Sequence, residues 1–146
     1  MASLKVGNYQ GQNTVFDTGL NSLANNGRVL SSEINNSSDK YYYVDLELKV
    51  TYGTGPTAGN TVDLYLISSQ DDGTTYPDGD SSNDAPANTK VASFPLKNNT
   101  SAQIIPFRGV PLPPGKHKYL IKNTSGQTMA ASGNYLKRNS WMPEIA

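Results

Sequence analysis

Apolar and polar residues alternate over the longest regular stretch of the chain, residues 41–52. The apolar positions are Tyr42, Val44, Leu46, Leu48, Val50 and Tyr52, and the positions between them are Tyr43, Asp45, Glu47, Lys49 and Thr51. Successive side chains of a strand point to opposite faces, so a period of two predicts a long strand with one buried face and one solvent face.

The following segment repeats this pattern after an interruption. Residues 53–60 are rich in Gly, Thr and Pro, which favour turns. Residues 61–69 then resume the alternation, with Val62, Leu64 and Leu66 on one face and Asp63 and Tyr65 on the other. We expect the two strands to pair as antiparallel neighbours in one sheet.

Shorter strands are predicted on both sides of this pair. Residues 19–24 and 28–34 flank Asn25-Asn26-Gly27, a sequence that tolerates positive φ and predicts a tight hairpin. Pro95 and Pro106 lie in or beside apolar runs, so their strands should be edges or carry bulges. The remaining strands are expected at residues 3–9, 89–96, 101–107, 116–122 and 128–136.

About eight or nine short strands with close turn signals and no helical period predict an all-β fold. Each strand has one apolar face, so two antiparallel sheets must close over a shared core as a β-sandwich, with a jelly roll as the expected topology. We expect residues 14–138 to form the sandwich, residues 1–13 to form an N-terminal arm or first strand, and residues 139–146 to form a C-terminal tail.

The amino-acid composition excludes several kinds of chemistry but says less about the fold. The chain has 146 residues, enough for one domain, and no Cys, which excludes disulfides, thiolate metal sites and thiol nucleophiles. Its 12 Lys and Arg balance 12 Asp and Glu. Residues 1–84 nevertheless carry four basic and eleven acidic side chains, whereas residues 85–146 carry eight basic side chains and one acidic side chain. The two halves could form complementary association surfaces or mix their charges within one sandwich.

Membranes and nucleic acids are not expected as partners. No stretch approaches the roughly 18 apolar residues of a membrane span, and no basic cluster exceeds two adjacent residues. The N-terminal segment has no apolar region of the kind found in secretory signals, so we expect synthesis in a cytoplasm.

An acidic loop is expected at residues 70–88, between two predicted strands. Asp78, Asp80 and Asp84 could supply oxygen ligands to calcium, although the spacing does not match a helical calcium loop and no bidentate Glu follows. A solvated loop or a loop that docks on a neighbouring subunit is the alternative.

Catalytic signals are weak. The single histidine, His117, lies between two lysines at a predicted strand start, where we expect it to be exposed. Asp45 and Glu47 share one strand face and could form the carboxylate pair of a glycoside hydrolase, but that face is predicted to be solvated. We therefore predict no catalytic residue, no metal, no cofactor and no enzyme activity.

Exposed aromatic residues suggest binding. Tyr41, Tyr43 and Tyr65 are predicted to point away from the core, and Trp141 lies in the expected tail. Sugar-binding sandwiches use such rings as platforms for pyranose rings, and subunit interfaces are also enriched in Tyr and Trp. Both interpretations stay open at this point.

Three segments resemble a known family: residues 19–50, residues 61–79 with their acidic Gly-Thr-Tyr loop, and residues 111–137 with their proline corner. They are similar to a family of small structural proteins of tailed bacteriophages. The resemblance implies a virion component made in the host cytoplasm, most simply a capsid decoration or cement protein on the outside of the head. Its implied partners are the major capsid protein and other copies of the chain, as a trimer. The alternative is a carbohydrate-binding or adhesion module in a head fibre or near the tail.

Both ends of the chain carry apolar or aromatic side chains that could contact such a partner. Free termini normally fray, so these side chains either fold back on the sandwich or insert into another protein. For the second case we predict partner contacts by Lys137, Arg138, Trp141, Tyr9 and Leu4.

Overall fold

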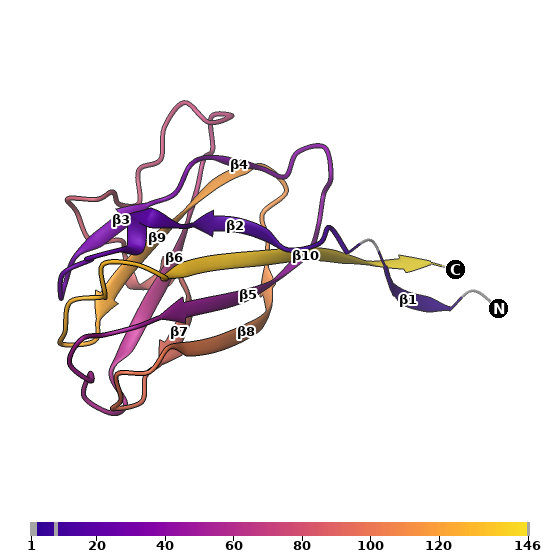
Figure 1. The fold of residues 1–146 in the computed structure, drawn as a ribbon. Coiled ribbons are helices and arrows are strands. Elements are labelled where there is room, and N and C mark those ends of the chain that lie inside the picture. Colours follow the sequence, from indigo (N-terminus) through magenta and orange to yellow (C-terminus); the bar gives the residue numbers. More distant parts are fainter. Residues whose placement is uncertain (1–2, 8, 146) are drawn as a thin grey trace.

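Two antiparallel sheets pack face to face in the computed structural model of the chain, which describes residues 3–7 and 9–145 (Figure 1). One sheet has the strand order β1-β10-β5-β8, and β2 also pairs with β10. Its strands are β1 (Leu4–Gly7), β2 (Asn13–Phe16), β5 (Tyr43–Val50), β8 (Gln103–Pro111) and β10 (Tyr135–Ile145). We call it the first sheet.

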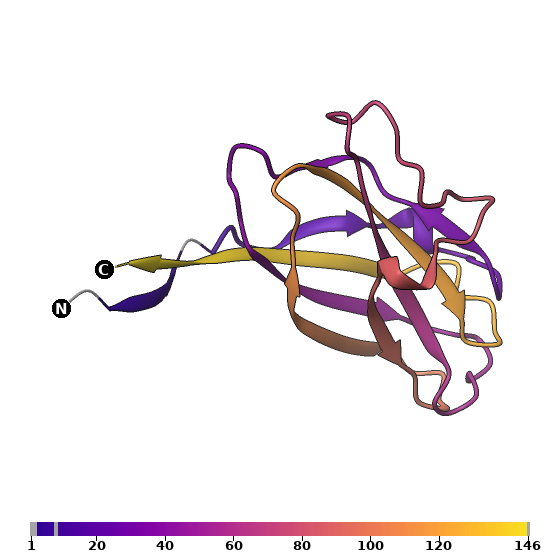
Figure 2. The same ribbon diagram turned by 180° about the vertical axis from the view of Figure 1, so that it is seen from behind.

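The second sheet has the order β3-β9-β6-β7, and β4 also pairs with β9. Its strands are β3 (Arg28–Leu30), β4 (Ile34–Asn35), β6 (Thr61–Ser68), β7 (Lys90–Pro95) and β9 (Lys116–Thr124). Two short 3₁₀ helices, η1 (Thr18–Leu20) and η2 (Ala87–Thr89), lie in the connections. Figure 2 shows the same two layers from behind. The predicted antiparallel β-sandwich of jelly-roll type is confirmed.

The core forms where the predicted apolar faces meet. The four apolar side chains of β5 from Val44 to Val50 are at most 2% exposed and belong to one cluster with residues of the second sheet. The opposing side chains include Val62, Leu64, Phe94, Tyr119 and Ile121. Burying an aliphatic or aromatic side chain contributes about 1.5–3 kcal/mol, so this alternation supplies much of the stability. Tyr42 departs from it: its side chain is 60% exposed, because β5 begins one residue later.

The predicted pairing of residues 41–52 with residues 61–69 is wrong. β5 lies in the first sheet and β6 in the second, and the turn-rich residues 51–60 cross from one layer to the other. β5 instead pairs with β8 and β10, and β6 pairs with β7 and β9. Both arrangements bury the same apolar faces, and therefore the alternation alone does not distinguish them.

The predicted hairpin around Asn26 is also absent. Residues 19–24 form η1 and turns rather than a strand, with Leu20 fully buried, and β3 pairs with β9. Asn26 does adopt a positive φ of 61°, as its sequence context suggested. The turn therefore exists, but it leads from an irregular segment into β3.

The proline and tail predictions have different outcomes. β7, which contains Pro95, and β8, which contains Pro106, lie at the sheet edges, as predicted.

The strand expected at 128–136 begins only at Tyr135 and runs to Ile145 as β10, so the segment expected as a C-terminal tail is mostly strand. Only Ala146 of that segment lies outside the described residues.

The far end of β10 leaves the sandwich. Beyond Trp141, residues 142–145 pair with β1, and this two-stranded arm extends away from the two layers (Figures 1 and 2). Leu4 and Ile145 on the arm are 74% and 81% exposed. Among the described residues, no helix has the length and apolar character that crossing a membrane would require.

Ion pairs link the acidic and basic halves of the chain. Lys90 Nζ lies 3.4 Å from Asp63 Oδ2, and Lys116 Nζ lies 3.3 Å from Asp72 Oδ1. Lys122 makes a third such contact, described below. The opposite charges thus mix within one sandwich.

Candidate ligand-binding face

The outer face of the first sheet gathers aromatic and charged side chains from β5, β8 and β10. Because Val44, Leu46 and Leu48 point inward, Tyr43, Asp45 and Glu47 must point outward. The register of β10 opposite β5 places Trp141 beside Tyr43, Asn139 beside Asp45, and Lys137 beside Glu47. We call this surface the outer face.

A pair of stacked aromatic rings marks one end of the outer face. The ring centroids of Tyr43 and Trp141 are 4.7 Å apart, and their planes meet at 27°. Such stacking adds about 0.5–1.5 kcal/mol beyond simple burial. Both side chains remain partly exposed, so the pair forms a fixed aromatic platform on the surface.

Asp45 holds this platform in position. Its Oδ1 accepts a hydrogen bond from the indole Nε1 of Trp141 at 3.2 Å and one from the backbone N–H of Gly109 at 2.9 Å. The second contact exists because β8 bulges opposite Asp45, and Gly109 there has φ of 69°, a conformation that favours glycine. The carboxylate therefore fixes the orientation of the indole.

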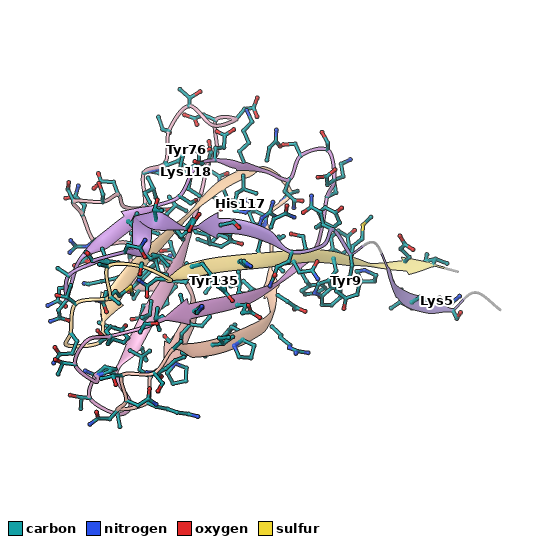
Figure 3. The ribbon with its side chains drawn as sticks, viewed as in Figure 1. Lys5, Tyr9, Tyr76, His117, Lys118 and Tyr135 are labelled. Carbon is teal, nitrogen blue, oxygen red and sulfur yellow. The ribbon has the colours of Figure 1, made fainter. Side chains whose placement is uncertain are left out.

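Glu47 plays a similar part for a second aromatic ring, Tyr135, farther along the same face (Figure 3). The Tyr135 hydroxyl donates to Glu47 Oε1 at 2.8 Å, and this hydrogen bond raises the pKa of Tyr135. Lys137 Nζ lies 4.5 Å from the centroid of the Tyr135 ring. The ring is thus held between a carboxylate and a cation.

A shallow hollow of about 210 Å³ lies between these aromatic groups. Its lining consists of Gln12, Asp45, Leu46, Glu47, Pro106, Arg108, Lys137, Arg138 and Asn139. The hollow is smaller than the roughly 300–1,000 Å³ of pockets that enclose drug-sized ligands. Its side chains present both donors and acceptors, which suits a polyhydroxylated group lying on the surface.

The carboxylate pair considered for glycoside hydrolysis lies on this face, as its sequence position predicts. Asp45 and Glu47 each accept hydrogen bonds from neighbouring side chains of the sheet. Their observed role is to hold Trp141 and Tyr135. The absence of enzyme activity stays a prediction.

The five residues predicted to contact a partner lie in different places. Trp141 and Lys137 are on the outer face, and Tyr9, which is 57% exposed, lies beside β10 near the arm (Figure 3). Leu4 is on the arm itself. Arg138 points to the interior, because it alternates with Lys137 along β10.

Sequence reasoning missed Tyr135, Arg108 and Asn139 as members of the outer face. Alternation does continue through β10, but the inward positions Arg138 and Ser140 are polar, so the apolar pattern fades after Leu136. The proline and the bulge in β8 likewise hide the outward position of Arg108.

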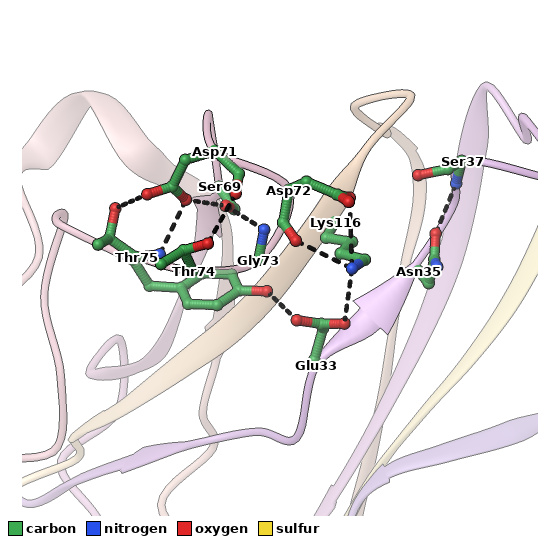
Figure 4. Close-up of polar contacts among 11 residues, drawn as sticks. Glu33, Asn35, Ser37, Ser69, Asp71, Asp72, Gly73, Thr74, Thr75 and Lys116 are labelled. Atoms are coloured by element: carbon green, nitrogen blue, oxygen red, sulfur yellow. Dashed lines mark hydrogen bonds and ion pairs between the residues drawn. The ribbon is translucent and has the colours of Figure 1, made fainter.

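The outer face of the second sheet is covered by the acidic loop, which in the structure lies between the end of β6 at Ser68 and the start of η2 at Ala87. Ile67 and Leu120 point away from the core cluster and are nevertheless fully buried. The Tyr76 ring of the loop lies 4.2 Å from Lys118 Nζ, and its hydroxyl donates to Glu33 Oε2 at 2.6 Å (Figures 3 and 4). The loop therefore closes over this sheet and leaves the first sheet as the open one.

The carboxylates of the acidic loop are engaged within the protein. Asp84 Oδ1 lies 2.6 Å from Arg28 Nε and 2.7 Å from Lys122 Nζ, and these contacts hold the pKa of Asp84 well below its usual range. The backbone N–H and hydroxyl of Thr75 and the hydroxyl of Ser69 bind Asp71 and lower its pKa to about 2 (Figure 4). In the part of the chain that the structure describes, no three His, Asp or Glu side chains are placed to hold a metal.

A second depression, of about 730 Å³, lies at the base of the arm. It is lined by Asp39, Lys40, Tyr41, Tyr42, Leu112, Pro114, Met142 and Pro143. Its lining is more apolar than that of the outer-face hollow, and it lacks a carboxylate that fixes an aromatic ring. We call it the arm groove.

The remaining predicted aromatic residues lie apart. Tyr65 is on β6 beneath the acidic loop, and Tyr41 lines the arm groove. His117 is fully buried, contrary to its predicted exposure, because its position on β9 faces the first sheet.

No family model matches the chain, and no curated protein sequence matches it. Some solved structures are similar to the chain. A CBM35 carbohydrate-binding module from Cellvibrio japonicus Abf62 is similar with a TM-score of 0.48 and 13% identity over 100% of this chain and 98% of that chain. A CBM36 domain of a xylanase from the hindgut metagenome of Trinervitermes trinervoides has a TM-score of 0.44 and 12% identity, covering 100% and 97%.

A third similar structure is a family 6 carbohydrate-binding module from Clostridium cellulolyticum in complex with xylose. Its TM-score is 0.41, with 11% identity over 94% of this chain and 91% of that chain. At these identities the likeness concerns the fold alone.

The comparison contradicts the expectation of a capsid decoration protein. The solved structures of similar fold named above are carbohydrate-binding modules, not shell components. The resemblance to phage structural proteins, and the partners that it implies, stay predictions from the sequence.

Proposed function

We propose that the chain is a non-catalytic carbohydrate-binding module that holds a glycan on the outer face. A pyranose ring has apolar C–H faces and a rim of hydroxyl groups. The stacked pair Tyr43 and Trp141 offers an aromatic surface to such a ring face, and the adjoining hollow offers carboxylates, amides and cations to its hydroxyls.

One observation carries this proposal: Asp45 fixes the Trp141 indole on an exposed surface directly beside the polar hollow. An exposed aromatic ring that is held in one orientation loses little conformational entropy on binding. Rings anchored in this way are prepared for a ligand rather than merely tolerated at the surface.

Binding without reaction fits the same contacts. The two carboxylates of the face have fixed hydrogen-bond partners in the sheet, and the surface is open and shallow. Chemistry on a glycosidic bond needs an acid and a second carboxylate that flank the bond in a water-controlled site.

The test is a broad glycan array followed by calorimetry on each hit. We expect Trp141→Ala and Tyr43→Ala each to weaken binding at least about tenfold, which corresponds to about 1.4 kcal/mol. Tyr42→Ala is the matched control, because Tyr42 is an exposed tyrosine that lines the arm groove instead. Its affinity should equal that of the wild type.

Circular dichroism of each variant shows that loss of binding is not loss of fold. An array without hits, or equal affinity of Trp141→Ala and the wild type, would overturn the proposal. If only Tyr42→Ala loses affinity, the result would indicate that the glycan binds in the arm groove and not on the outer face.

A further inference from the structure

A cleft of about 310 Å³ opens between the two sheets, beside β2, β4 and the connection from β3 to β4. It shares one lining residue, Arg138, with the outer-face hollow. Its lining consists of Asn13, Thr14, Val15, Ser31, Ser32, Glu33, Ile34, Asn35 and Arg138. We call it the lateral cleft.

Arg138 is the only cation that lines the lateral cleft among the described residues. It points inward from β10 between Leu136 and Ser140, both of which are fully buried. Its guanidinium donates one side-chain hydrogen bond, from Nη1 to Ser140 Oγ at 2.8 Å. A guanidinium has five N–H donors, so most of its hydrogen-bonding capacity is unused by the described side chains.

No described carboxylate lies within ion-pair distance of Arg138. Asp39 acts on it only at longer range, and burial lowers the pKa of its guanidinium. Glu33 at the cleft opening is already engaged by the Tyr76 hydroxyl and, at 3.9 Å, by Lys116. Leaving a half-buried cation without a counter-charge is costly unless something else supplies the charge.

A second, independent observation comes from the facing strand. His117 and Tyr119 of β9 are fully buried, and both ring nitrogens of His117 and the Tyr119 hydroxyl have no hydrogen-bond partner of acceptable geometry among the described residues. The two rings meet edge to face at 5.4 Å, and the charge of Arg138 acts on both. Buried polar groups in proteins are normally paired, and an unpaired one costs about 1–3 kcal/mol.

We propose that this interior site binds a small oxyanion, a carboxylate or a phosphate or sulfate group. Its oxygens would accept hydrogen bonds from the Arg138 guanidinium, the Tyr119 hydroxyl and one N–H of His117. The donors come from both sheets, so the anion would bridge the two layers. A planar guanidinium is suited to holding two oxygens of one such group. The site does not depend on the proposed glycan site.

The chain offers a direct reporter, because His117 is its only histidine. Nuclear magnetic resonance of the imidazole C–H groups should show one set of signals that shifts saturably as sodium acetate, phosphate or sulfate is added at constant ionic strength. Acetate tests the carboxylate class, and the other two salts test the tetrahedral oxyanions. Sodium chloride at the same ionic strength should leave the signals in place.

Arg138→Gln should abolish the saturable shift, whereas Arg108→Gln, which removes a cation from the outer face, should keep it. Thermal unfolding adds a second measurement: the oxyanion should raise the melting temperature of the wild type and of Arg108→Gln, and the saturable part of this rise should be absent in Arg138→Gln.

Unchanged His117 signals in the wild type with all three salts would overturn the proposal and indicate buried water instead. Equal shifts in the wild type and Arg138→Gln would overturn it as well. If Arg138→Gln does not fold, Arg138→Lys replaces it, since a lysine keeps the charge without the planar fork and should weaken the shift.

Discussion

Fully buried side chains of this protein differ in whether their polar atoms have hydrogen-bond partners. Phe94 and Leu48 are fully buried among apolar neighbours, which needs no polar partner. Asn123, also fully buried, donates to the carbonyl oxygens of Leu23 and Gln127. His117 is also fully buried, but neither of its ring nitrogens has a hydrogen-bond partner of acceptable geometry among the described residues.

The pH dependence of stability follows from this burial. Burial is the largest cause that lowers the pKa of His117 from 6.5 to about 4; the backbone of Gly115 offsets part of this change, and the charge of Arg138 adds a smaller lowering. The unfolded chain therefore gains a proton below about pH 6.5, whereas the folded protein resists protonation until about pH 4. Stability should fall as the pH drops through this window, by at most about 3 kcal/mol.

Urea unfolding at intervals from pH 7 to 4.5 measures this loss. The carboxylates with lowered pKa, such as Asp71, lose their contribution only at lower pH, because their unfolded pKa is near 3.8. His117→Leu should have a nearly flat profile over the same range. A wild-type profile that is equally flat would contradict the expected neutral, buried histidine.

At the scale of elements, the acidic loop is a cover rather than a free extension. Its two ends join β6 and β7, and the Tyr76 and Asp84 side chains attach its middle to the second sheet. The sequence interpretation as a calcium site would need several carboxylates around one point. Instead, Asp71 and Asp80 close local turns, and Asp84 binds two cations of neighbouring strands.

Removing the Asp84 carboxylate should loosen this cover. In Asp84→Ala, Arg28 and Lys122 lose their shared partner, so we expect limited proteolysis to cut within residues 70–88 severalfold faster than in the wild type. Asp78→Ala is the control, since Asp78 has no side-chain hydrogen bond or ion pair in the described part of the chain. Equal cleavage rates in the two variants would show that the ion pairs of Asp84 with Arg28 and Lys122 do not hold the loop in place.

At the scale of the whole molecule, the sandwich and its arm are distinct parts. The two layers share the core cluster, whereas β1 pairs only with β10, beyond the last contact of β10 with β5 at Trp141. The outer face, the lateral cleft and the arm groove all include residues of the long strand β10. β10 contributes Trp141 to the first, Arg138 to the second and Met142 to the third.

Deleting residues 1–7 and 142–146 should leave the sandwich folded. None of the described residues in these two segments belongs to the core cluster, so we expect calorimetry to give a melting temperature within about 5 °C of the wild type. Glycan affinity should also be kept, because Trp141 and its partners remain. A truncated chain that unfolds at room temperature would show that the arm is part of the folding unit.

The alternation of the sequence predicted which faces of the main strands are buried, and the prolines predicted which strands lie at sheet edges. Both are local properties: the pleat fixes the direction of each side chain, and a missing N–H excludes a central position. The sequence alone therefore places Tyr43, Asp45 and Glu47 on an outward face.

Strand partners were decided only by the tertiary structure, because apolar faces of several strands can close over one core in more than one order. That choice placed β5 and β6 in different sheets, brought Trp141 from an expected tail onto Tyr43, and buried His117 between the sheets. It also laid the acidic loop over Ile67 and Leu120. Local patterns determined the faces of this protein, and contacts between distant segments determined its sites.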